Sequence, residues 1–414
     1  MKKKLISVIS IFVCVSLAFN LSGCAETAQA ENLMDKFENI SCKAFASPDD
    51  SFYSAETDFA LKLLKNTSEE NTNNLVSPLS AVICLAMVAN GAKGETQEQI
   101  LTALSGETDI NNLNEYLGRY SINGDEKNKA LKSANSIWIN KNMGHEVCDE
   151  FLKTDAMYYR SGVYNESFDS SIEDKVNGWV NEHTDSMIEK IAEKIDPNTV
   201  MLLINALAFE SKWADQYAGD TWEQAFTCTD KSTQTADMMH FDENMYLTDD
   251  NAVGFIKPYE DGNYSFAVLL PDEDTDIDSY IFSLNGEHLR NILSNAQKAS
   301  VDVTMPKFKS ESDLKLNEAL ESMGMKDMFG DKADFSNLVK GGGVCVDKVV
   351  QKTFIEVSES GTKAAAVTAA FVAESAAPDM VETYTVELNR PFLYMIIETD
   401  SNTPIFIGKL ESVE

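Results

Sequence analysis

Apolar residues recur at helical spacing mostly in the first half of the chain and at strand-like spacing mostly in the second half. Three- and four-residue spacing predicts helices at residues 59–65, 81–89, 95–104 and 172–191, the last with Trp179 on its apolar side. Alternating or continuous apolar runs predict strands at residues 133–140, 200–209, 264–270, 300–305, 346–357, 392–398 and 405–410. Because no linker rich in Pro, Gly or Ser separates these segments, we expect one α+β domain at residues 51–414.

The first residues form a separate, removable segment. Lys2, Lys3 and Lys4 precede an apolar run at residues 5–19, which is too short for a membrane-spanning helix of ~20 residues. The run ends in Leu-Ser-Gly-Cys at residues 21–24, which resembles the lipobox of bacterial lipoproteins. That resemblance implies a signal peptide at residues 1–23 and a diacylglycerol on Cys24. Cleavage after Ala30 is the alternative and would release a soluble secreted protein.

The segment at residues 24–50 is polar, has small side chains and shows no sustained period, so it is interpreted as a spacer between membrane and domain. We therefore expect an extracytoplasmic protein, either anchored to a bacterial membrane or released to the outside.

Composition narrows the possible partners. The chain has 67 acidic and 34 basic residues, a net charge of −33, and no basic patch with interleaved aromatics, which argues against a nucleic-acid partner. Five cysteines remain once the leader is removed and Cys24 is lipidated, and their scattered positions predict small buried side chains, not zinc ligands or a disulfide framework. These five are Cys42, Cys84, Cys148, Cys228 and Cys345.

Three segments resemble motifs for catalysis or metal binding, but each lacks a required residue at the required position. His145-Glu146 lacks a second histidine four residues after the first, and the Ser358 to Gly361 segment lacks the leading glycine of a nucleophile elbow. Asp272, Asp274 and Asp276 imitate a calcium loop, but Ile277 and Ser283 occupy positions that need Gly and Glu. We therefore expect neither an enzyme nor a bound cofactor or metal.

Residues 356–377 have an unusual composition, with a long run of Ala, Thr and Val after Gly361. A surface helix is one interpretation, because Ala favours helices. Read at a period of two, however, Thr362, Ala364, Ala366, Thr368 and Ala370 share one face, and all five are small and uncharged. Such a segment can enter the middle of a sheet without burying a charge.

This segment resembles the hinge and reactive-centre loop of inhibitory serpins, and further motifs agree over about residues 50–410. These motifs are Asn-Leu-Val-Ser-Pro-Leu-Ser at 74–80, Ala-Lys-Gly-Glu-Thr at 92–96, Asn-Ala-Leu-Ala-Phe-Glu-Ser-Lys-Trp at 205–213, Met-Pro-Lys-Phe at 305–308, Ala-Asp-Phe-Ser at 333–336, Asn-Arg-Pro-Phe at 389–392 and Ile-Phe-Ile-Gly at 405–408. The resemblance implies the serpin fold, with helices packed around large sheets and an exposed reactive loop.

The resemblance also assigns residues. It places the hinge at Glu359, Gly361, Thr362, Ala364, Ala365, Ala366 and Thr368. It places the top and centre of the opening sheet at Lys307, Trp213, Ser77, Ser80, Asn205 and Gln351, with Lys307 and Glu359 as a pair that holds the sheet closed. Two residues depart from the family: Gln351 replaces a usual histidine, so hydrogen bonding there must differ, and Lys363 replaces a glutamate but is expected to point to solvent after insertion.

The family implies a monomeric suicide substrate that forms an acyl-enzyme with a serine protease and then inserts its cut loop. Counting fourteen residues on from Gly361 gives Ser375-Ala376 as the reactive bond, with Ala373 and Ala377 as alternative reactive residues because the stretch at 376–389 is longer than in many relatives. These small side chains favour elastase-like or subtilisin-like targets over trypsin-like ones. A non-inhibitory serpin-fold surface protein, acting in binding, adhesion or as a decoy substrate, is the main alternative, and an unrelated surface hydrolase is a further one.

Overall fold

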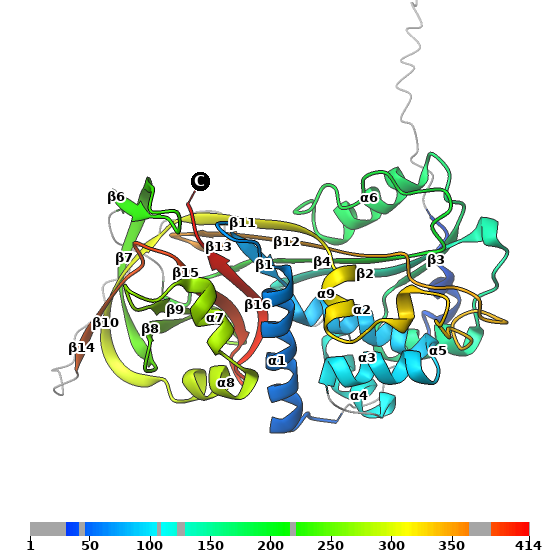
Figure 1. Cartoon of the computed structure of the whole chain (residues 1–414), viewed down its shortest axis with the longest axis horizontal. Coiled ribbons are helices and arrows are strands. Elements are labelled where there is room, and N and C mark those ends of the chain that lie inside the picture. The colour runs from blue at the N-terminus through cyan, green and yellow to red at the C-terminus, as the bar shows by residue number, and fades with distance from the viewer. Residues whose placement is uncertain are drawn as a thin grey trace, which may run out of the picture.

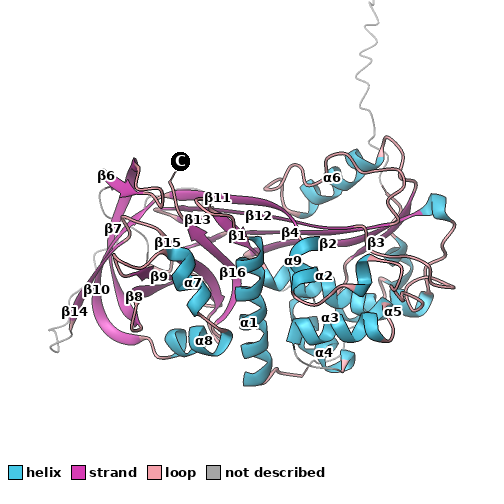
Figure 2. Cartoon of the chain, viewed as in Figure 1, coloured by secondary structure: helices cyan, strands magenta, loops and turns pink. Residues whose placement is uncertain are grey.

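The computed structural model describes residues 30–40, 46–105, 109–121, 129–215, 221–363 and 382–413. Within these ranges most helices gather at one end of an elongated molecule, and strands dominate the other end (Figure 1, Figure 2). The α-helices are α1 (Asp50–Thr67), α2 (Pro78–Gly91), α3 (Glu95–Ser105), α4 (Ile110–Ser121), α5 (Asp149–Tyr158), α6 (Ile172–His183), α7 (Ile277–Ser283), α8 (Gly286–Ser294) and α9 (Asn317–Ser322). Short 3-10 turns are η1 (Leu33–Phe37), η3 (Lys141–Met143) and η4 (Asp327–Phe329).

Two large sheets organise the strands. The seven-stranded sheet has the order β3-β2-β4-β12-β13-β5, with β11 paired to β12. Its strands are β2 (Leu131–Asn140), β3 (Gly162–Glu166), β4 (Met201–Phe209), β5 (Ser211–Lys212), β11 (Phe308–Lys315), β12 (Lys348–Ser358) and β13 (Gly361–Thr362). The sheet mixes parallel and antiparallel pairs, since β2 is antiparallel to β4 and β12 is parallel to β4.

The nine-stranded sheet has the order β1-β16-β15-β9-β8-β7-β10-β14, with β6 paired to β7. Its strands are β1 (Asn74–Val76), β6 (Thr221–Thr227), β7 (Thr233–Thr248), β8 (Ala252–Pro258), β9 (Tyr264–Pro271), β10 (Gln297–Pro306), β14 (Thr383–Glu387), β15 (Phe392–Glu398) and β16 (Thr403–Leu410). Helices and strands of both sheets pack together in one main core, and a smaller cluster lies between α6 and the seven-stranded sheet. This confirms the predicted α+β class.

Helix α2 packs against one face of the seven-stranded sheet, in contact with β2 and β4. Ser77 caps the helix by accepting a hydrogen bond from the Ser80 N–H, and Pro78 occupies the first turn, where its missing N–H costs nothing. All but one of the residues of α2 are buried, so the helix is apolar on every side. Helix α6 lies on the opposite face of the sheet, as Figure 1 shows.

The helix predicted at residues 172–191 is shorter than expected. Helix α6 ends at His183, and the hydroxyl of Thr184 donates to the Val180 carbonyl. Asp185 and Ser186 then adopt positive φ angles of 48° and 62°, which a helix cannot continue through. The apolar residues beyond this point, Ile188 and Ile191, still pack in the small core under α6, which explains the misleading period.

Part of the predicted spacer packs against the domain. Turn η1 buries Met34, and Asn32 forms an isolated β-bridge with Tyr164 of β3. The Asn32 side chain also accepts hydrogen bonds from the N–H groups of Met34 and Val163. Residues 30–40 are therefore attached to the outer edge of the seven-stranded sheet, whereas residues 1–29 lie outside the described part of the chain.

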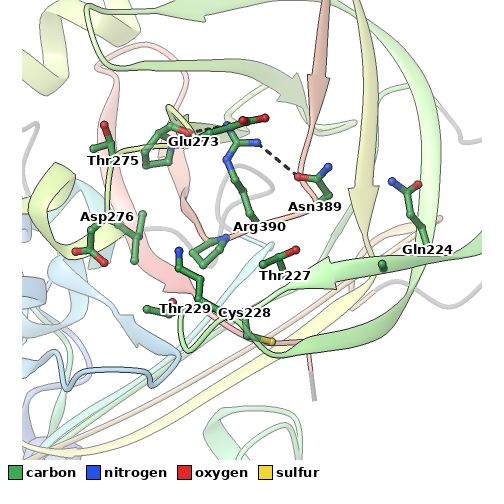
Figure 3. Close-up of a pocket in the computed structure, with 14 residues that line it drawn as sticks. Gln224, Thr227, Cys228, Thr229, Glu273, Thr275, Asp276, Asn389 and Arg390 are labelled. Atoms are coloured by element: carbon green, nitrogen blue, oxygen red, sulfur yellow. Dashed lines mark hydrogen bonds between the residues drawn. The ribbon is translucent and has the colours of Figure 1, made fainter.

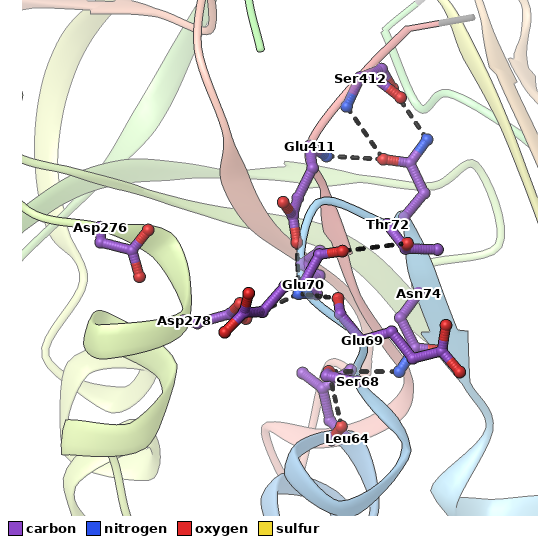
Figure 4. A network of polar contacts seen from close by, with 12 residues as sticks. Leu64, Ser68, Glu69, Glu70, Thr72, Asn74, Asp276, Asp278, Glu411 and Ser412 are labelled. Carbon is purple, nitrogen blue, oxygen red and sulfur yellow. Dashed lines mark hydrogen bonds and ion pairs between the residues drawn. The ribbon is translucent and has the colours of Figure 1, made fainter. Parts of the chain in front are cut away.

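Polar contacts fix the C-terminal end of the chain (Figure 4). The ammonium of Lys409 is fully buried, contacts both Asp278 and Glu411, and donates to the Glu69 carbonyl at 3.0 Å. Asn73 accepts hydrogen bonds from the backbone N–H groups of Glu411 and Ser412. Burying a lysine is tolerable only with such charged partners, so β16 is locked in place beside β1.

Candidate functional site

The seven-stranded sheet changes its pairing between β4 and β12. These strands are directly paired in parallel from Leu202 and Lys348 up to Ala208 and Phe354. Beyond that point the two residues of β13 pair with β12 on one side and with β5 on the other. The first residues of the segment that resembles a serpin hinge therefore lie between two strands, at one end of the sheet.

Gly361 makes this entry possible. Its φ of +140° is rare for other residues, and an added Cβ would lie 2.2 Å from the Ser211 carbonyl oxygen and 2.7 Å from the Lys212 Cα. Because both obstacles are backbone atoms, no side chain can be accommodated without moving β5. Glycine is thus required at this position by close approach of two strands.

Thr362 points into the protein and is fully buried. Its hydroxyl lies 2.6 Å from the hydroxyl of Tyr259, which is also buried. Burial raises the pKa of Tyr259, so the phenol is neutral and can donate or accept this hydrogen bond. The Tyr259 ring stacks on Trp213 at 4.7 Å, and the Trp213 indole N–H donates to the Ser358 carbonyl at 2.9 Å. We call Glu359, Gly361 and Thr362, with Tyr259 and Trp213, the hinge end of the sheet.

Charged groups cross the hinge end at the surface. The Lys307 ammonium lies 3.1 Å from both Glu359 and Asp237, and the Thr221 hydroxyl donates to Glu359 at 3.1 Å. Partial burial acts to raise the pKa of Glu359, but hydrogen bonds from its own backbone, Lys307 and Thr221 outweigh it, so the pKa is lowered. Slight burial acts to lower the pKa of Lys307, but the hydrogen bonds and negative charges of Asp237 and Glu359 outweigh it, so the pKa is raised. The predicted pair is thus an ion pair in this structure.

A second polar cluster lies where β4 and β12 are paired. The Gln351 amide accepts from the Ser77 N–H at 3.0 Å and donates to the Ser77 carbonyl at 2.9 Å and to Asn205 at 2.5 Å. Asn205 donates to Ser80 and Asn135, and Ser80 donates to Asn135. We call Ser77, Ser80, Asn135, Asn205 and Gln351 the central amide network. It joins β2, β4 and β12 to the start of α2.

Gln351, which stands where the resemblance implies a histidine, forms hydrogen bonds to both Ser77 and Asn205. Its amide has both a donor and an acceptor end, so it binds the Ser77 N–H and carbonyl together. The side chains of Gln351 and Asn205 are completely buried and fully hydrogen-bonded, which avoids the cost of an unpaired buried amide. Gln351 therefore leaves no unpaired side-chain group in the central amide network.

Several predicted residues lie outside the described part of the chain. Lys363 is the last described residue of the hinge, is half-exposed, and has its ammonium 5.3 Å from the centre of the Phe354 ring. Beyond it nothing is described until residue 382. The undescribed positions are hinge residues Ala364, Ala365, Ala366 and Thr368, reactive-bond candidates Ala373, Ser375, Ala376 and Ala377, and the lipidation candidate Cys24.

A separate pocket of about 460 Å³ lies at the strand-rich end, between β6, the start of α7 and the link after β14 (Figure 3). Arg390 lines it and donates to the Pro271 carbonyl at 2.8 Å and to Asn389 at 3.5 Å. The Asn-Arg-Pro-Phe motif thus connects β14 and β15 to the end of β9. It is part of the scaffold and does not contribute to the hinge end.

The structure adds residues that the sequence did not suggest. Tyr259, Asn135 and Asp237 complete the two clusters, but each is distant in sequence from its partners and carries no motif of its own. Within the described ranges no group of three or more His, Cys, Asp or Glu side chains is placed to hold a metal ion. None of the helices in those ranges is both long and apolar enough to span a membrane.

Comparisons with known proteins agree with this geometry. Residues 54–413 match the family described as serpin (serine protease inhibitor). The chain is 31% identical over 380 residues to the leukocyte elastase inhibitor of Bos taurus, covering 86% of this chain and 98% of that protein. It is 30% identical over 362 residues to an uncharacterized serpin-like protein of Thermococcus kodakarensis, covering 85% of this chain and 83% of that protein.

Solved structures give the same result. The thermophilic serpin tengpin in its native state is similar with a TM-score of 0.85 and 40% identity, covering 93% of this chain and all of that chain. The latent state of tengpin is less similar, with a TM-score of 0.77, at 39% identity and covering 89% of this chain and all of that chain. These matches confirm the resemblance drawn from the motifs, and a hydrolase unrelated to this family is excluded.

Proposed function

Because the chain belongs to the serpin family, we propose that it inhibits serine proteases as a suicide substrate. A target protease attacks the reactive-bond carbonyl with its own serine and forms an acyl-enzyme. The cut loop then enters the seven-stranded sheet as an added strand, as is known for the family. The catalytic groups belong to the protease, and this chain supplies the substrate bond and the sheet that opens.

The observation that carries the proposal is the position of β13. Gly361 and Thr362 already pair with β12 and β5, so the first step of insertion needs no new register. Further insertion would separate β4 from β12 along their paired length, starting at Ala208 and Phe354 and proceeding toward Leu202 and Lys348. Ala364, Ala366, Thr368 and Ala370, which follow Thr362 at every second position, can enter this gap without burying a charge. The first charged side chain at the same spacing is Glu374, next to the proposed reactive bond.

The length of the segment also fits. The fourteen residues from Thr362 to Ser375 would span about 46 Å as a strand. Strand β12 has eleven residues and therefore spans about 36 Å, so an inserted segment that ends at Ser375 reaches the far end of the sheet. A protease attached through Ser375 would be carried that distance and distorted against the body, which stops deacylation.

For specificity we propose cleavage between Ser375 and Ala376, with Ala373 and Ala377 as alternative reactive residues. Small side chains suit the shallow primary pocket of elastase-like or subtilisin-like proteases, whereas a trypsin-like pocket would leave its carboxylate unpaired. The similarity to a protein named leukocyte elastase inhibitor supports this class of target.

Mixing the mature protein with elastase, subtilisin and trypsin tests the proposal. We expect a complex that resists denaturant with the first two proteases, and a released fragment that begins at Ala376. Trypsin should form little complex. If the loop were cut by elastase and subtilisin without any covalent complex, the protein would belong to the non-inhibitory class of surface serpins.

We also propose that the protein is a lipoprotein attached to the outside of a bacterial membrane through Cys24. The lipobox after the apolar run supports this, and a diacylglycerol with two chains gives stable anchoring where one chain would not. Cys24→Ala should move the protein from the membrane to the medium or leave it unprocessed. Equal membrane association of variant and wild type would contradict the anchor.

A further inference from the structure

Trp222 is one of the three large hydrophobic side chains that are strongly exposed in the described residues, at 43% of its surface. It lies on β6, next to Thr221, whose hydroxyl donates to Glu359 of the hinge end. A tryptophan left in water forgoes much of its burial energy, although a single exposed apolar residue is by itself ordinary. Its position beside the hinge distinguishes it from the other two, Met143 and Phe282.

Cross-strand register shows which side chains share its face. Trp222 is opposite Met238 on β7, and Met238 is opposite Pro306 on β10. Residues two positions along a strand point to the same side, so His240 and its neighbour Thr304 form the next row. The rings of Trp222 and His240 lie 5.5 Å apart, and the His240 ring is 3.3 Å from both Asp302 and Thr304. The Trp222 ring therefore contacts the His240 ring on one side and is exposed to solvent on the other.

The same face continues to β14. Thr304 is opposite Glu387, and Asp302 is opposite both Asp242 and Thr385. Asp242 and Glu387 are exposed, Asp302 is half-exposed, and all three are acidic. Strand β14 begins directly after the reactive segment, at Thr383, and β6 begins beside the hinge. The four strands β6, β7, β10 and β14 therefore border both ends of the segment that carries the reactive bond. Thr221 reaches Glu359 from one face of β6, and Trp222 lies on the other face.

We propose that this face is a second contact surface for the target protease, with Trp222 as its apolar anchor. The inference rests on the proposed inhibitory function. Only eighteen residues, 364–381, connect the last described residue of the hinge to the residue before β14, so a globular protease bound to them must lie close to this sheet. Tryptophan is enriched among residues that dominate binding energy. The partner surface beside the protease active site would be apolar, with a basic rim that faces Asp242, Asp302 and Glu387.

Association kinetics with subtilisin and with elastase test the proposal. We expect Trp222→Ala to slow complex formation about five- to thirty-fold, with the number of inhibitor molecules consumed per protease unchanged. Trp222→Phe should recover most of the rate. Phe282→Ala is the matched control, because it removes an aromatic side chain that is 63% exposed on α7, away from the hinge, and should have no effect. Unfolding midpoints of all variants establish that the fold is intact.

The outcomes separate the two proposals. A wild-type protein that forms no covalent complex with either protease contradicts the proposed function. Normal complex formation, with the rate for Trp222→Ala within about two-fold of wild type for both proteases, contradicts only the second contact surface. If Phe282→Ala slows complex formation as much as Trp222→Ala does, the second contact surface is also contradicted. The triple variant Asp242→Asn, Asp302→Asn and Glu387→Gln tests the acidic residues. If the salt dependence of its association rate equals that of wild type, these residues do not contact the protease.

Discussion

The hinge end and the central amide network lie along the same gap in one sheet but are built differently. At the hinge end two loop residues, Gly361 and Thr362, already occupy the position between β12 and β5, and one hydroxyl pair joins Thr362 to Tyr259. In the central network β4 and β12 pair directly, and Gln351 and Asn205 bind each other across them. The first region is partly occupied and the second is closed.

This contrast indicates how the proposed insertion would be controlled. At the hinge end Gly361 and Thr362 are already paired with β12 and β5, so no strand pairing must be broken there for the proposed insertion to begin. Further along, β4 and β12 must lose their backbone pairing and the bond between Gln351 and Asn205. We infer that the hinge end sets whether insertion begins, whereas the central network sets how readily the sheet opens.

The largest expected effect comes from the hinge end. Thr362→Arg should convert the inhibitor to a substrate, because a fully buried position would receive a charge with no partner at a cost of several kcal/mol. Gel electrophoresis after reaction with elastase should show cleaved protein and almost no covalent complex. Lys363→Arg is the control, since this neighbouring side chain is half-exposed and already charged. Unchanged complex formation by Thr362→Arg would mean that Thr362 does not face inward during insertion.

A smaller effect is expected in the central network. Gln351→Met keeps the shape but removes the partners of the Ser77 N–H and carbonyl and one partner of Asn205. Leaving these buried groups unpaired should lower the free energy of unfolding by about 3 kcal/mol. Urea unfolding measures it, and Lys309→Met on the exposed side of β11 is the control. A stability equal to that of wild type would show that the network does not hold the sheet closed.

The smallest effect is expected for the surface pair of Lys307 and Glu359. Both side chains are about one-third exposed, so the pair should contribute no more than about 1 kcal/mol. Lys307→Met or Glu359→Gln should increase polymer formation slightly on mild heating, as measured by size-exclusion chromatography. Variants that stay as monomeric as wild type would show that the pair does not restrain the hinge.

The same pair gives a pH dependence. The pKa of Glu359 is lowered from 4.5 by folding, so its contribution is present above about pH 4.5 and is lost as the pH falls through the folded value. The pKa of Lys307 is raised from 10.5, so its contribution is present below about pH 10.5 and is lost as the pH rises through the folded value. The difference between wild type and Glu359→Gln should therefore disappear in acid, and a difference that persists there would have another cause.

Some elements could be predicted from sequence because their apolar pattern is strong. Strands β4 and β9 are continuous buried runs, and they appear where expected. Strand β7 was missed because most of its sixteen residues are polar and alternate irregularly in burial. Helix α6 was predicted too long because Ile188 and Ile191 continue its apolar period from a non-helical segment.

The candidate site shows a similar division. Gly361 and Thr362 were found because the hinge has an unusual composition, and Gln351 because it departs from a family motif. Tyr259 and Asn135 carry no such signal, since Tyr259 directly follows β8 and Asn135 lies within β2, and only the fold brings them against Thr362 and Asn205. Pairing across more than a hundred residues of sequence, as between Tyr259 and Thr362, cannot be obtained from local patterns.

Insertion of the cut loop between β4 and β12 is the central claim, and the stability of the loop-cleaved protein tests it most directly. The mature protein would be cut in its reactive segment by a protease that it does not trap, and its unfolding in urea compared with that of the intact protein. Insertion adds a strand with its full set of hydrogen bonds, so the cleaved wild type should unfold at much higher urea, whereas cleaved Thr362→Arg should not. If cleaved and intact wild type unfolded at the same urea concentration, the loop would not insert and the proposed mechanism would be wrong.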